Sequence, residues 1–222
     1  MNNEIQNTFL NQTFVYKTPE EFFTEAEKYQ EVMMRYNGAM REVKTKLEVL
    51  NDEFQVRSQR NPIEFIKYRM KKPSSIINKL QRKGFESTLE AVLEHINDIA
   101  GIRVVCSFID DIYAVTDMLI QQDDITLIER KDYIKQPKSN GYRSLHLVVA
   151  VPVYFSNQKQ QMRVEVQIRT IAMDFWASLE HQIHYKNFEN ASESIIQELK
   201  DCADIISSTD LKMQNIQKQL YR

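Results

Sequence analysis

The sequence predicts an α+β fold, in which helices flank a mixed central sheet of about five strands. Two observations indicate this class. Both ends of the chain carry apolar residues at helical spacing, whereas the middle alternates short β-branched runs with amphipathic segments. Hydrophobic residues make up 42% of the chain and charged residues 27%, which is the composition of a globular protein with a substantial core.

Residues 1–60 are expected to form a helical region. Apolar side chains recur every three or four positions between residues 22 and 54, a heptad-like seam that predicts one long helix packed against a neighbouring helix. The pair Thr18-Pro19 fits the N-cap and the first position of this helix. Glycine weakens a helix interior, so the helix could be interrupted at Asn37-Gly38.

Residues 61–187 are expected to hold the sheet, because Asn61-Pro62 ends the helical region. Periodicity and turn residues predict strands at 63–71, 100–108, 125–134, 142–155 and 161–170. They predict helices at 73–84, 87–96, 110–122 and 172–186, and a C-terminal helix within 188–222. In the helix at 172–186, the residues expected to be buried are Phe175, Leu179 and Ile183.

The overall charge and composition restrict the cellular location of the protein and the partners that it can bind. A net charge of −2 and a pI of about 6.1 give no global attraction to nucleic acid or to a membrane surface. No signal peptide and no run of membrane-spanning length is visible. Two cysteines without a CxxC pattern suit a reducing compartment, so a cytoplasmic protein is expected.

Several familiar sites are absent. The four glycines form neither a GxxxxGK[ST] loop nor a GxGxxG fingerprint, and there is no GxSxG elbow. His181 and His184 are three residues apart, whereas the zincin motif needs a spacing of four, so histidines near a helix end are favoured over a zinc site. If this chain binds phosphates, cationic side chains must do most of the binding.

Residues 67–83 carry seven cations with no acid between them. Arg69 and Lys71 are two apart on a predicted strand and therefore share a face. Ser75 opens the next helix, and Lys79 lies one turn further on the same face. Helix N-termini favour anions and arginine offers a planar surface to a purine, so the segment suits a nucleoside triphosphate. The alternative is a solvated basic face.

Two further segments carry candidate site residues. In NDIAGIRVV, Asp98 precedes a predicted buried strand beside the basic region, which makes it a candidate Mg²⁺ ligand. In KSNGYRSLH, we expect Tyr142, Ser144 and His146 to share one strand face. An exposed tyrosine near cations suits stacking on a base, whereas the alternative is a surface tyrosine after a turn.

The stretch MRVEVQIRT, residues 162–170, divides its side chains between two faces of a strand. Val164, Val166 and Ile168 share one face. The other face carries two cations, an acid and an amide: Arg163, Glu165, Gln167 and Arg169. Cross-strand ion pairs on an exposed sheet face would explain the pattern. The second hypothesis is the floor of a site for a polyanion and its metal ion.

Together these segments surround two carboxylates, Asp98 and Glu165, with cations and one aromatic residue. Phosphate groups and Mg²⁺ would offset the repulsion among the cations, which favours phosphoryl-transfer chemistry without a phosphate-binding loop. Two alternatives stay open. One is a non-catalytic module that binds nucleotides or single-stranded RNA, although acids in the groove do not favour RNA. The other is a template-independent nucleotidyltransferase that releases pyrophosphate.

Five segments also resemble, in order and spacing, the synthetase domain of the RelA/SpoT homologues: RMKKPSSI, DIAGIR, NGYRSLH, VEVQIRT and FWASLEH. The resemblance covers residues 60–187, and the short chain is similar to the small alarmone synthetases, the RelP/RelQ type of Firmicutes. It implies a nucleotidyltransferase-like synthetase domain at 61–187. The implied reaction transfers the β,γ-pyrophosphate of ATP to the 3′-hydroxyl of GDP or GTP, giving ppGpp or pppGpp and AMP. With four histidines and no His-Asp pair, no hydrolase is expected.

The resemblance also implies an ATP site and a metal site. Arg69 and Arg103 would sandwich adenine. The ATP phosphates would be held by Lys71, Ser75, Lys79 and Arg82. Asp98 and Glu165 would bind Mg²⁺, and one of them, by preference Asp98, would help to deprotonate the attacking hydroxyl.

On the acceptor side, the resemblance implies that Tyr142 stacks on guanine, with Lys138 and His146 at the phosphates. The other acceptor-side residues would be Gln167, Arg169, Asp174 and Glu180. Two positions depart from the family pattern. Asp174 stands where relatives often carry asparagine, which puts a guanine contact in doubt. Lys131 stands where some carry arginine, which weakens any bidentate phosphate contact. The family is typically homotetrameric, which implies oligomer contacts through the heptad seam and the helix within 188–222.

Overall fold

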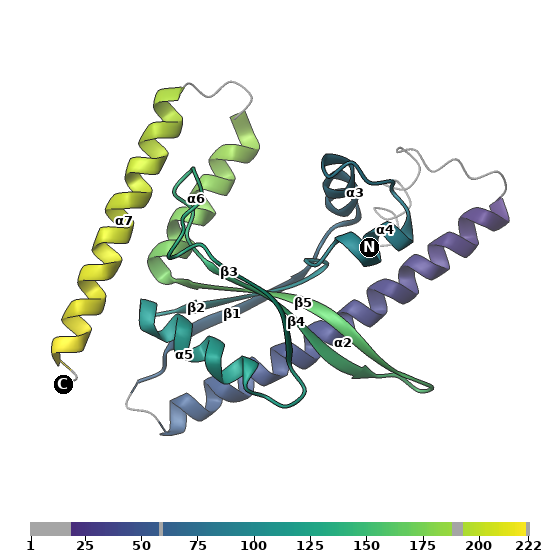
Figure 1. Cartoon of the computed structure of the whole chain (residues 1–222), viewed down its shortest axis with the longest axis horizontal. Helices are drawn as coiled ribbons and strands as arrows, with labels where there is room; N and C mark the ends of the chain where they lie inside the picture. The colour runs from purple at the N-terminus through teal and green to yellow at the C-terminus, as the bar shows by residue number, and fades with distance from the viewer. Residues whose placement is uncertain (1–18, 58–59, 188–192, 221–222) are drawn as a thin grey trace.

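The computed structural model describes residues 19–57, 60–187 and 193–220 (Figure 1). Eleven helices and strands fill these ranges. In chain order they are α2 (Pro19–Arg57), β1 (Ile63–Met70), α3 (Pro73–Arg82), α4 (Leu89–His95), β2 (Ala100–Cys106), α5 (Ile109–Ile120), β3 (Thr126–Asp132), β4 (Leu145–Tyr154), β5 (Lys159–Thr170), α6 (Ile171–Asn187) and α7 (Glu193–Leu220). Thr18, the expected N-cap of the first long helix, lies outside the described residues.

The strands form one mixed sheet in the order β1-β2-β5-β4-β3. The pair β2·β5 is parallel and the other neighbours are antiparallel. This arrangement confirms the predicted α+β class with five strands. The parallel register sets Gly101 opposite Glu165 and Arg103 opposite Gln167, so polar side chains of two central strands lie beside one another.

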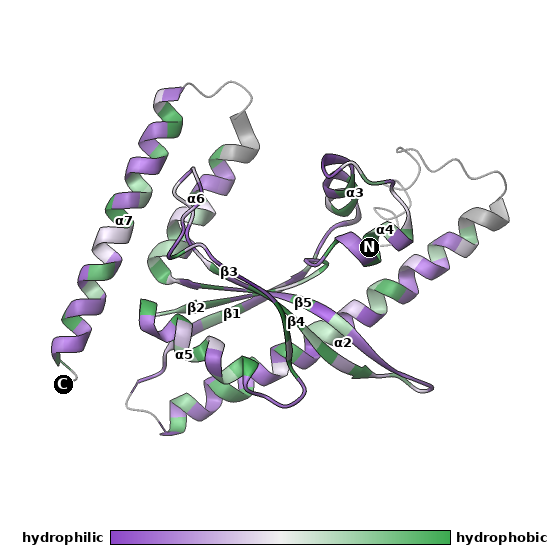
Figure 2. Cartoon of the chain, viewed as in Figure 1, coloured by the Kyte–Doolittle hydropathy of each residue, from purple (hydrophilic) through white to green (hydrophobic). Residues whose placement is uncertain are grey.

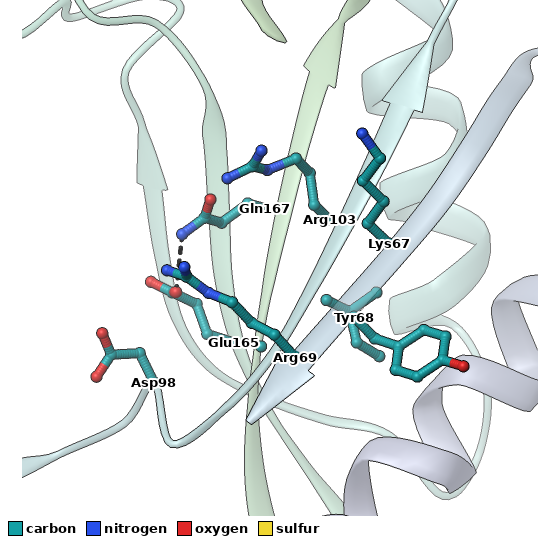
Figure 3. Close-up of a pocket in the computed structure, with 9 residues that line it drawn as sticks. Lys67, Tyr68, Arg69, Asp98, Arg103, Glu165 and Gln167 are labelled. Atoms are coloured by element: carbon teal, nitrogen blue, oxygen red, sulfur yellow. Dashed lines mark hydrogen bonds between the residues drawn. The ribbon is translucent and has the colours of Figure 1, made fainter. Parts of the chain in front are cut away.

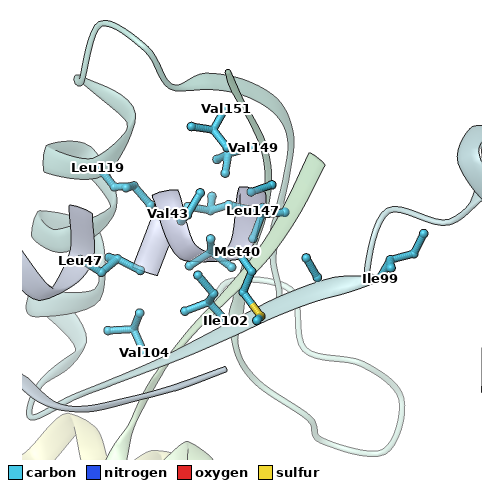
Figure 4. Close-up of a cluster of buried hydrophobic side chains, with 14 of the residues drawn as sticks. Met40, Val43, Leu47, Ile99, Ile102, Val104, Leu119, Leu147, Val149 and Val151 are labelled. Atoms are coloured by element: carbon cyan, nitrogen blue, oxygen red, sulfur yellow. The ribbon is translucent and has the colours of Figure 1, made fainter. Parts of the chain in front are cut away.

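The long helix α2 crosses one face of this sheet and is continuous through Asn37-Gly38 (Figure 1). Its apolar seam packs on the chain's own sheet: Met40, Val43 and Leu47 lie among side chains of β2 and β4 (Figure 4). The prediction that the seam packs against a neighbouring helix is therefore wrong, because the sheet buries these residues. Oligomer contacts through the rest of the seam stay a prediction.

Gly38 lies where α2 packs tightly against the sheet. A β-carbon built at this position would lie 3.1 Å from Val153 Cγ1. Glycine therefore costs the helix some stability but allows the close packing that buries the seam.

We expect Gly38→Val to destabilise the fold, because a branched side chain would overpack this contact. The free energy of unfolding should fall by about 2 kcal/mol, which for a chain of this length lowers the Tm by roughly 4–8 °C. Thermal unfolding followed by circular dichroism measures the change. Val49→Ala, at an exposed position of the same helix, is the matched control and should shift the Tm little. An unchanged Tm in Gly38→Val would contradict the close packing.

Helix α6 leaves the end of β5 and packs against α7. Its buried apolar residues are Met173, Trp176 and Ala177, and Trp176 Nε1 donates to Leu199 O. The predicted burial of Phe175, Leu179 and Ile183 is wrong, since all three side chains are exposed. The reason is that α6 meets α7, β5 and β2 through Met173, Trp176 and Ala177, rather than through the row that carries Phe175. No helix among the described residues is long and apolar enough to cross a bilayer.

Candidate active site

Two adjoining cavities lie along the polar row of β5. The first has a volume of about 260 Å³ and is lined by β1, β2 and β5 residues that include Lys67, Arg69 and Arg103 (Figure 3). The second, of about 290 Å³, is lined by Lys79 and by residues of β3, β4 and the loop between them. Both cavities share the same three residues: Asp98, Glu165 and Gln167. The two carboxylates therefore lie at the junction of two basic cavities.

Asp98 is held by two lysines. Lys71 Nζ lies 2.8 Å and Lys79 Nζ 2.9 Å from its Oδ2 atom, because α3 folds back over the end of β1. Burial opposes ionisation of this carboxyl, but the hydrogen bonds from the two lysines outweigh it and hold the pKa of Asp98 below its usual value. The second oxygen, Oδ1, is buried and has no hydrogen-bond partner. A charged carboxylate with one free oxygen thus faces the junction.

Glu165 is the second acid of the junction. Gln167 Nε2 donates to its Oε2 at 2.9 Å, and His146 Nδ1 lies 3.3 Å from its Oε1. Burial raises the pKa of Glu165, but the contact with His146 outweighs it, so the pKa lies below its usual value. The negative charge of Asp98, which lines the same two cavities, opposes this lowering.

Four residues that the resemblance assigned to the acceptor side form a closed ring of contacts with Glu165: Gln167, Arg169, Tyr142 and His146. Arg169 Nη2 donates to the Tyr142 hydroxyl at 2.6 Å and to Gln167 Oε1 at 3.1 Å. The Tyr142 hydroxyl in turn lies 2.8 Å from His146 Nε2. Tyr142 and His146, expected on one strand face, are thus in contact. Ser144, expected on the same face, is fully buried, donates to Ile168 O and lines neither cavity. The strand begins only at Leu145, so alternation does not apply to residues 142–144.

Three residues of this cavity were not identified as a group from the sequence: Glu129, Lys131 and Tyr133. They alternate along β3 or directly after it, and Lys131 pairs in register with His146. Lys138 Nζ lies 4.7 Å and 4.8 Å from the ring centroids of Tyr133 and Tyr142. The period of two in ITLIERKDYI was the signal that could have found them.

The loop that carries Tyr142 is supported by α7. Gly141 adopts a positive φ of +87°, and a β-carbon there would lie 2.6 Å from the β-carbon of Ala203. Arg143 donates to Gly141 O at 2.9 Å and to Asp204 on α7 at 2.9 Å. The C-terminal helix therefore fixes the backbone on which the aromatic residue is placed.

Comparison with known proteins identifies the family. Residues 68–190 match the family model described as a region found in RelA / SpoT proteins. This chain belongs to the RelA/SpoT family. It is 45% identical to GTP pyrophosphokinase YwaC of Bacillus subtilis (strain 168), over 89% of this chain and 94% of the relative. It is 35% identical to GTP pyrophosphokinase YjbM of the same strain, over 87% of this chain and 90% of the relative.

Solved structures agree with the sequence relatives. Small alarmone synthetase 1 from Bacillus subtilis, bound to its product pppGpp, superposes with a TM-score of 0.82 at 35% identity. The match covers 88% of this chain and 100% of that one. Small alarmone synthetase 2 from the same species gives a TM-score of 0.78 at 44% identity, covering 86% and 98% of the two chains.

Seven residues that the RelA/SpoT resemblance assigned to the site lie outside both cavities: Lys71, Ser75, Arg82, Tyr142, Arg169, Asp174 and Glu180. Four of them, Lys71, Tyr142, Arg169 and Asp174, contact a residue that lines a cavity. Within the described part of the chain, the other three do not. Ser75 is exposed in the first turn of α3. Arg82, also exposed, donates from Nε to Asn78 O within its own helix. Glu180 on α6 accepts a hydrogen bond from Asn140 Nδ2 at 3.2 Å. The roles of all the assigned residues stay predictions.

Asp174 occupies a distinct position in this RelA/SpoT chain. Its Oδ1 atom accepts from Arg103 Nη1 at 3.1 Å and from Arg169 Nη1 at 3.2 Å, and the residue is only 8% exposed. Burial and the charge of Arg169 lower the pKa of Arg103, while the charge of Asp174 opposes this lowering. The carboxylate thus joins Arg103, which lines the first cavity, to Arg169, which contacts Gln167 at the junction.

We expect Asp174→Asn to destabilise the chain by about 1–3 kcal/mol, because two neighbouring guanidinium groups would lose their shared counter-charge. Urea unfolding measures the change, and Glu53→Gln, which breaks an exposed pair with Arg57, is the control. Unchanged stability together with a weakened affinity for GDP would instead support a direct contact between Asp174 and guanine.

Proposed function

We propose that this chain is a GTP pyrophosphokinase. It transfers the β,γ-pyrophosphate of ATP to the 3′-hydroxyl of GDP or GTP, making ppGpp or pppGpp and releasing AMP. The observation that carries the proposal is the pair of acids, Asp98 and Glu165, at the junction of two basic cavities. A transfer between two nucleotides needs two nucleotide sites that meet where the bond forms and breaks. The relatives named as GTP pyrophosphokinases support the same reaction.

The first cavity is proposed as the ATP site. Arg69 and Arg103 line it and offer two planar guanidinium groups for adenine. Lys71 and Lys79 both contact Asp98 at the junction, where the ATP phosphates would meet the acids. Ser75 and Arg82 would reach the outer phosphate oxygens from α3. The cationic side chains would stabilise the charge that develops on the transferred group.

The second cavity is proposed as the acceptor site. Tyr142 would stack on guanine, and Lys138 and His146 would contact the acceptor phosphates. Gln167 and Arg169 orient the acceptor side through their contacts with Glu165 and Tyr142. Asp174 and Glu180 would support this side from α6.

Mg²⁺ fits the junction. The buried and unpartnered Oδ1 atom of Asp98, together with Glu165, supplies the oxygen ligands that magnesium combines with substrate phosphates. A bound Mg²⁺ would neutralise charge on the transferred pyrophosphate. Asp98 is the proposed base for the attacking 3′-hydroxyl, since both oxygens of Glu165 already contact His146 and Gln167.

We also propose that residues 61–187 form the synthetase domain, because every residue that lines the two cavities lies between positions 67 and 167. Residues 1–60 would be a helical region, and residues 188–222 would provide an oligomer contact. A homotetramer in the cytoplasm is proposed. In support, α6 carries an exposed apolar row with a spacing of four: Ile171, Phe175, Leu179 and Ile183. Along α7, apolar and polar residues alternate (Figure 2). Light scattering after size exclusion gives the mass, to be compared with 26.3 kDa for one chain.

The test of function is a product assay. The purified chain is incubated with Mg²⁺, ATP labelled at the γ-phosphate, and GDP or GTP, and the products are separated. We expect label at the guanosine 3′-position and release of AMP. Release of labelled pyrophosphate would favour a nucleotidyltransferase, and absence of any transfer would overturn the proposal. Incubation with pppGpp alone tests the expected lack of hydrolase activity.

A further inference from the structure

Arg163 lies on β5 two residues before Glu165, on the same side of the strand, yet it lines neither cavity. Its guanidinium contacts the segment between α4 and β2. Nη1 donates to Asn97 Oδ1 at 2.6 Å, and Nη2 donates to Leu93 O at 2.6 Å. A longer contact of 3.5 Å joins Nη1 to Glu94 O. One side chain of β5 thus holds both the end of α4 and the residue that directly precedes Asp98.

The acceptors at the end of α4 have a physical reason to bind a cation. Carbonyl groups of a last helical turn lack partners within the helix, and this end of a helix carries partial negative charge. Lys83 Nζ also donates to a carbonyl at this helix end, His95 O, at 3.0 Å. The contact of Arg163 with Asn97 is additional, because capping α4 does not require it.

The backbone on either side of Asp98 is fixed from the apolar side as well. Ile96 and Ile99 are fully buried in the core, and Ile99 O accepts from Lys71 N at 2.8 Å. Residues 96 and 99 therefore anchor the connection to the core, and Arg163 anchors residue 97 to β5. The remaining residue, Asp98, projects toward the junction with one oxygen on the lysines and one without a partner.

We propose that Arg163 is a positioning residue that sets the separation of the two carboxylates. It ties the segment carrying Asp98 to the strand carrying Glu165, so both ligands of one divalent cation are held in a single hydrogen-bonded unit. This inference rests on the proposed function, in which the two acids share a metal ion. Residues that orient metal ligands without touching the metal contribute about 10–100-fold to metal affinity or activity.

The test uses Arg163→Gln, Arg163→Lys, Asn97→Ala and the double variant Arg163→Gln/Asn97→Ala. The first readout is Mn²⁺ binding, followed by electron paramagnetic resonance in the presence of a non-hydrolysable ATP analogue. The second is steady-state kinetics, which separates kcat from the KM for GDP. Arg57→Gln is the control, because Arg57 is an exposed arginine with a single carboxylate partner.

We expect Arg163→Gln to weaken Mn²⁺ binding and to lower kcat by about 10-fold each, with the KM for GDP changed less than twofold. Arg163→Lys should recover part of the loss, since a lysine can still reach one acceptor. Asn97→Ala should add little on the Arg163→Gln background, because the two residues act through one contact. If Arg163→Gln does not fold, Arg163→Lys and Asn97→Ala still decide the matter.

A loss of thermal stability with Mn²⁺ affinity and kcat unchanged would overturn the inference and leave Arg163 as a helix cap. The outcome is distinguishable from failure of the proposed function. If the unmodified chain transfers pyrophosphate but the variants bind Mn²⁺ normally, the inference about Arg163 is overturned and the proposed function is not. If the unmodified chain transfers no pyrophosphate but its Mn²⁺ binding still depends on Arg163, the proposed reaction is overturned and the inference about Arg163 is not.

Discussion

Asp98→Asn is expected to lower kcat for pyrophosphate transfer by at least ~100-fold while the chain stays folded. Asparagine keeps the shape and one oxygen acceptor for Lys71 and Lys79. It removes the negative charge that would hold Mg²⁺ and the basic oxygen that would accept the proton of the 3′-hydroxyl. Glu165→Gln should cause a loss of the same order, because the second metal ligand would be neutralised. Initial rates with labelled ATP and saturating GDP measure both effects.

Asp124→Asn is the matched control for this experiment. Asp124 also accepts from a lysine, Lys46, at 2.7 Å, but the pair lies on the surface away from both cavities. The kcat of Asp124→Asn for pyrophosphate transfer should match that of the unmodified chain. Full activity in both Asp98→Asn and Glu165→Gln would contradict the proposed metal site and the proposed mechanism.

Tyr142→Ala should raise the KM for GDP by about 10–100-fold, because stacking of a base on an aromatic ring contributes about 1–3 kcal/mol. The KM for ATP should change little, since Tyr142 contacts Lys138 and His146, which line the second cavity and not the first. Steady-state kinetics with each nucleotide varied in turn separates the two constants. An equal rise in both would mean that the loss spreads through Arg169 to the ATP side.

Tyr142→Phe separates the ring from its hydroxyl. Phenylalanine can still stack, but Arg169 Nη2 and His146 Nε2 lose their shared partner. We therefore expect a smaller rise in the KM for GDP than in Tyr142→Ala, with a lower kcat because Glu165 is held less firmly. Tyr154→Ala, at an exposed tyrosine at the end of β4, is the control and should leave both constants unchanged.

The sheet could be predicted from the sequence because alternation is a local property. Val164, Val166 and Ile168 are fully buried, while Glu165 and Gln167 face the cavities, as the period of two requires. The faces of helices were harder to predict. In α6 the sequence contains one apolar row with Phe175 and another with Trp176, and only the position of α7 decides which row is buried.

The seam of α2 shows the same limit. Its spacing predicts a helix with one apolar side, but a helix of another chain, a helix of the same chain and a sheet all bury such a side. The glycine that suggested a break is what allows the sheet to approach. Local propensity identified Gly38 as unusual, and tertiary packing determined what it does.

For the site, the residue types could be predicted but the pairings could not. Lys71 and Lys79 are eight positions apart, and both reach Asp98 because the chain turns back between β1 and α3. Asp174 was expected near guanine from the resemblance, whereas the structure places it between two arginines. Such pairings depend on side-chain directions that no spacing rule contains.

The contact between Gly141 and Ala203 has a consequence for how this chain can evolve. A larger residue at either position would push the C-terminal helix and the tyrosine-bearing loop apart, since a β-carbon at 141 already falls 2.6 Å from that of Ala203. The two positions, 62 residues apart in the sequence, are therefore expected to change only in concert among descendants of this gene. Substitution in a helix far from the chemistry would be constrained as tightly as substitution beside it.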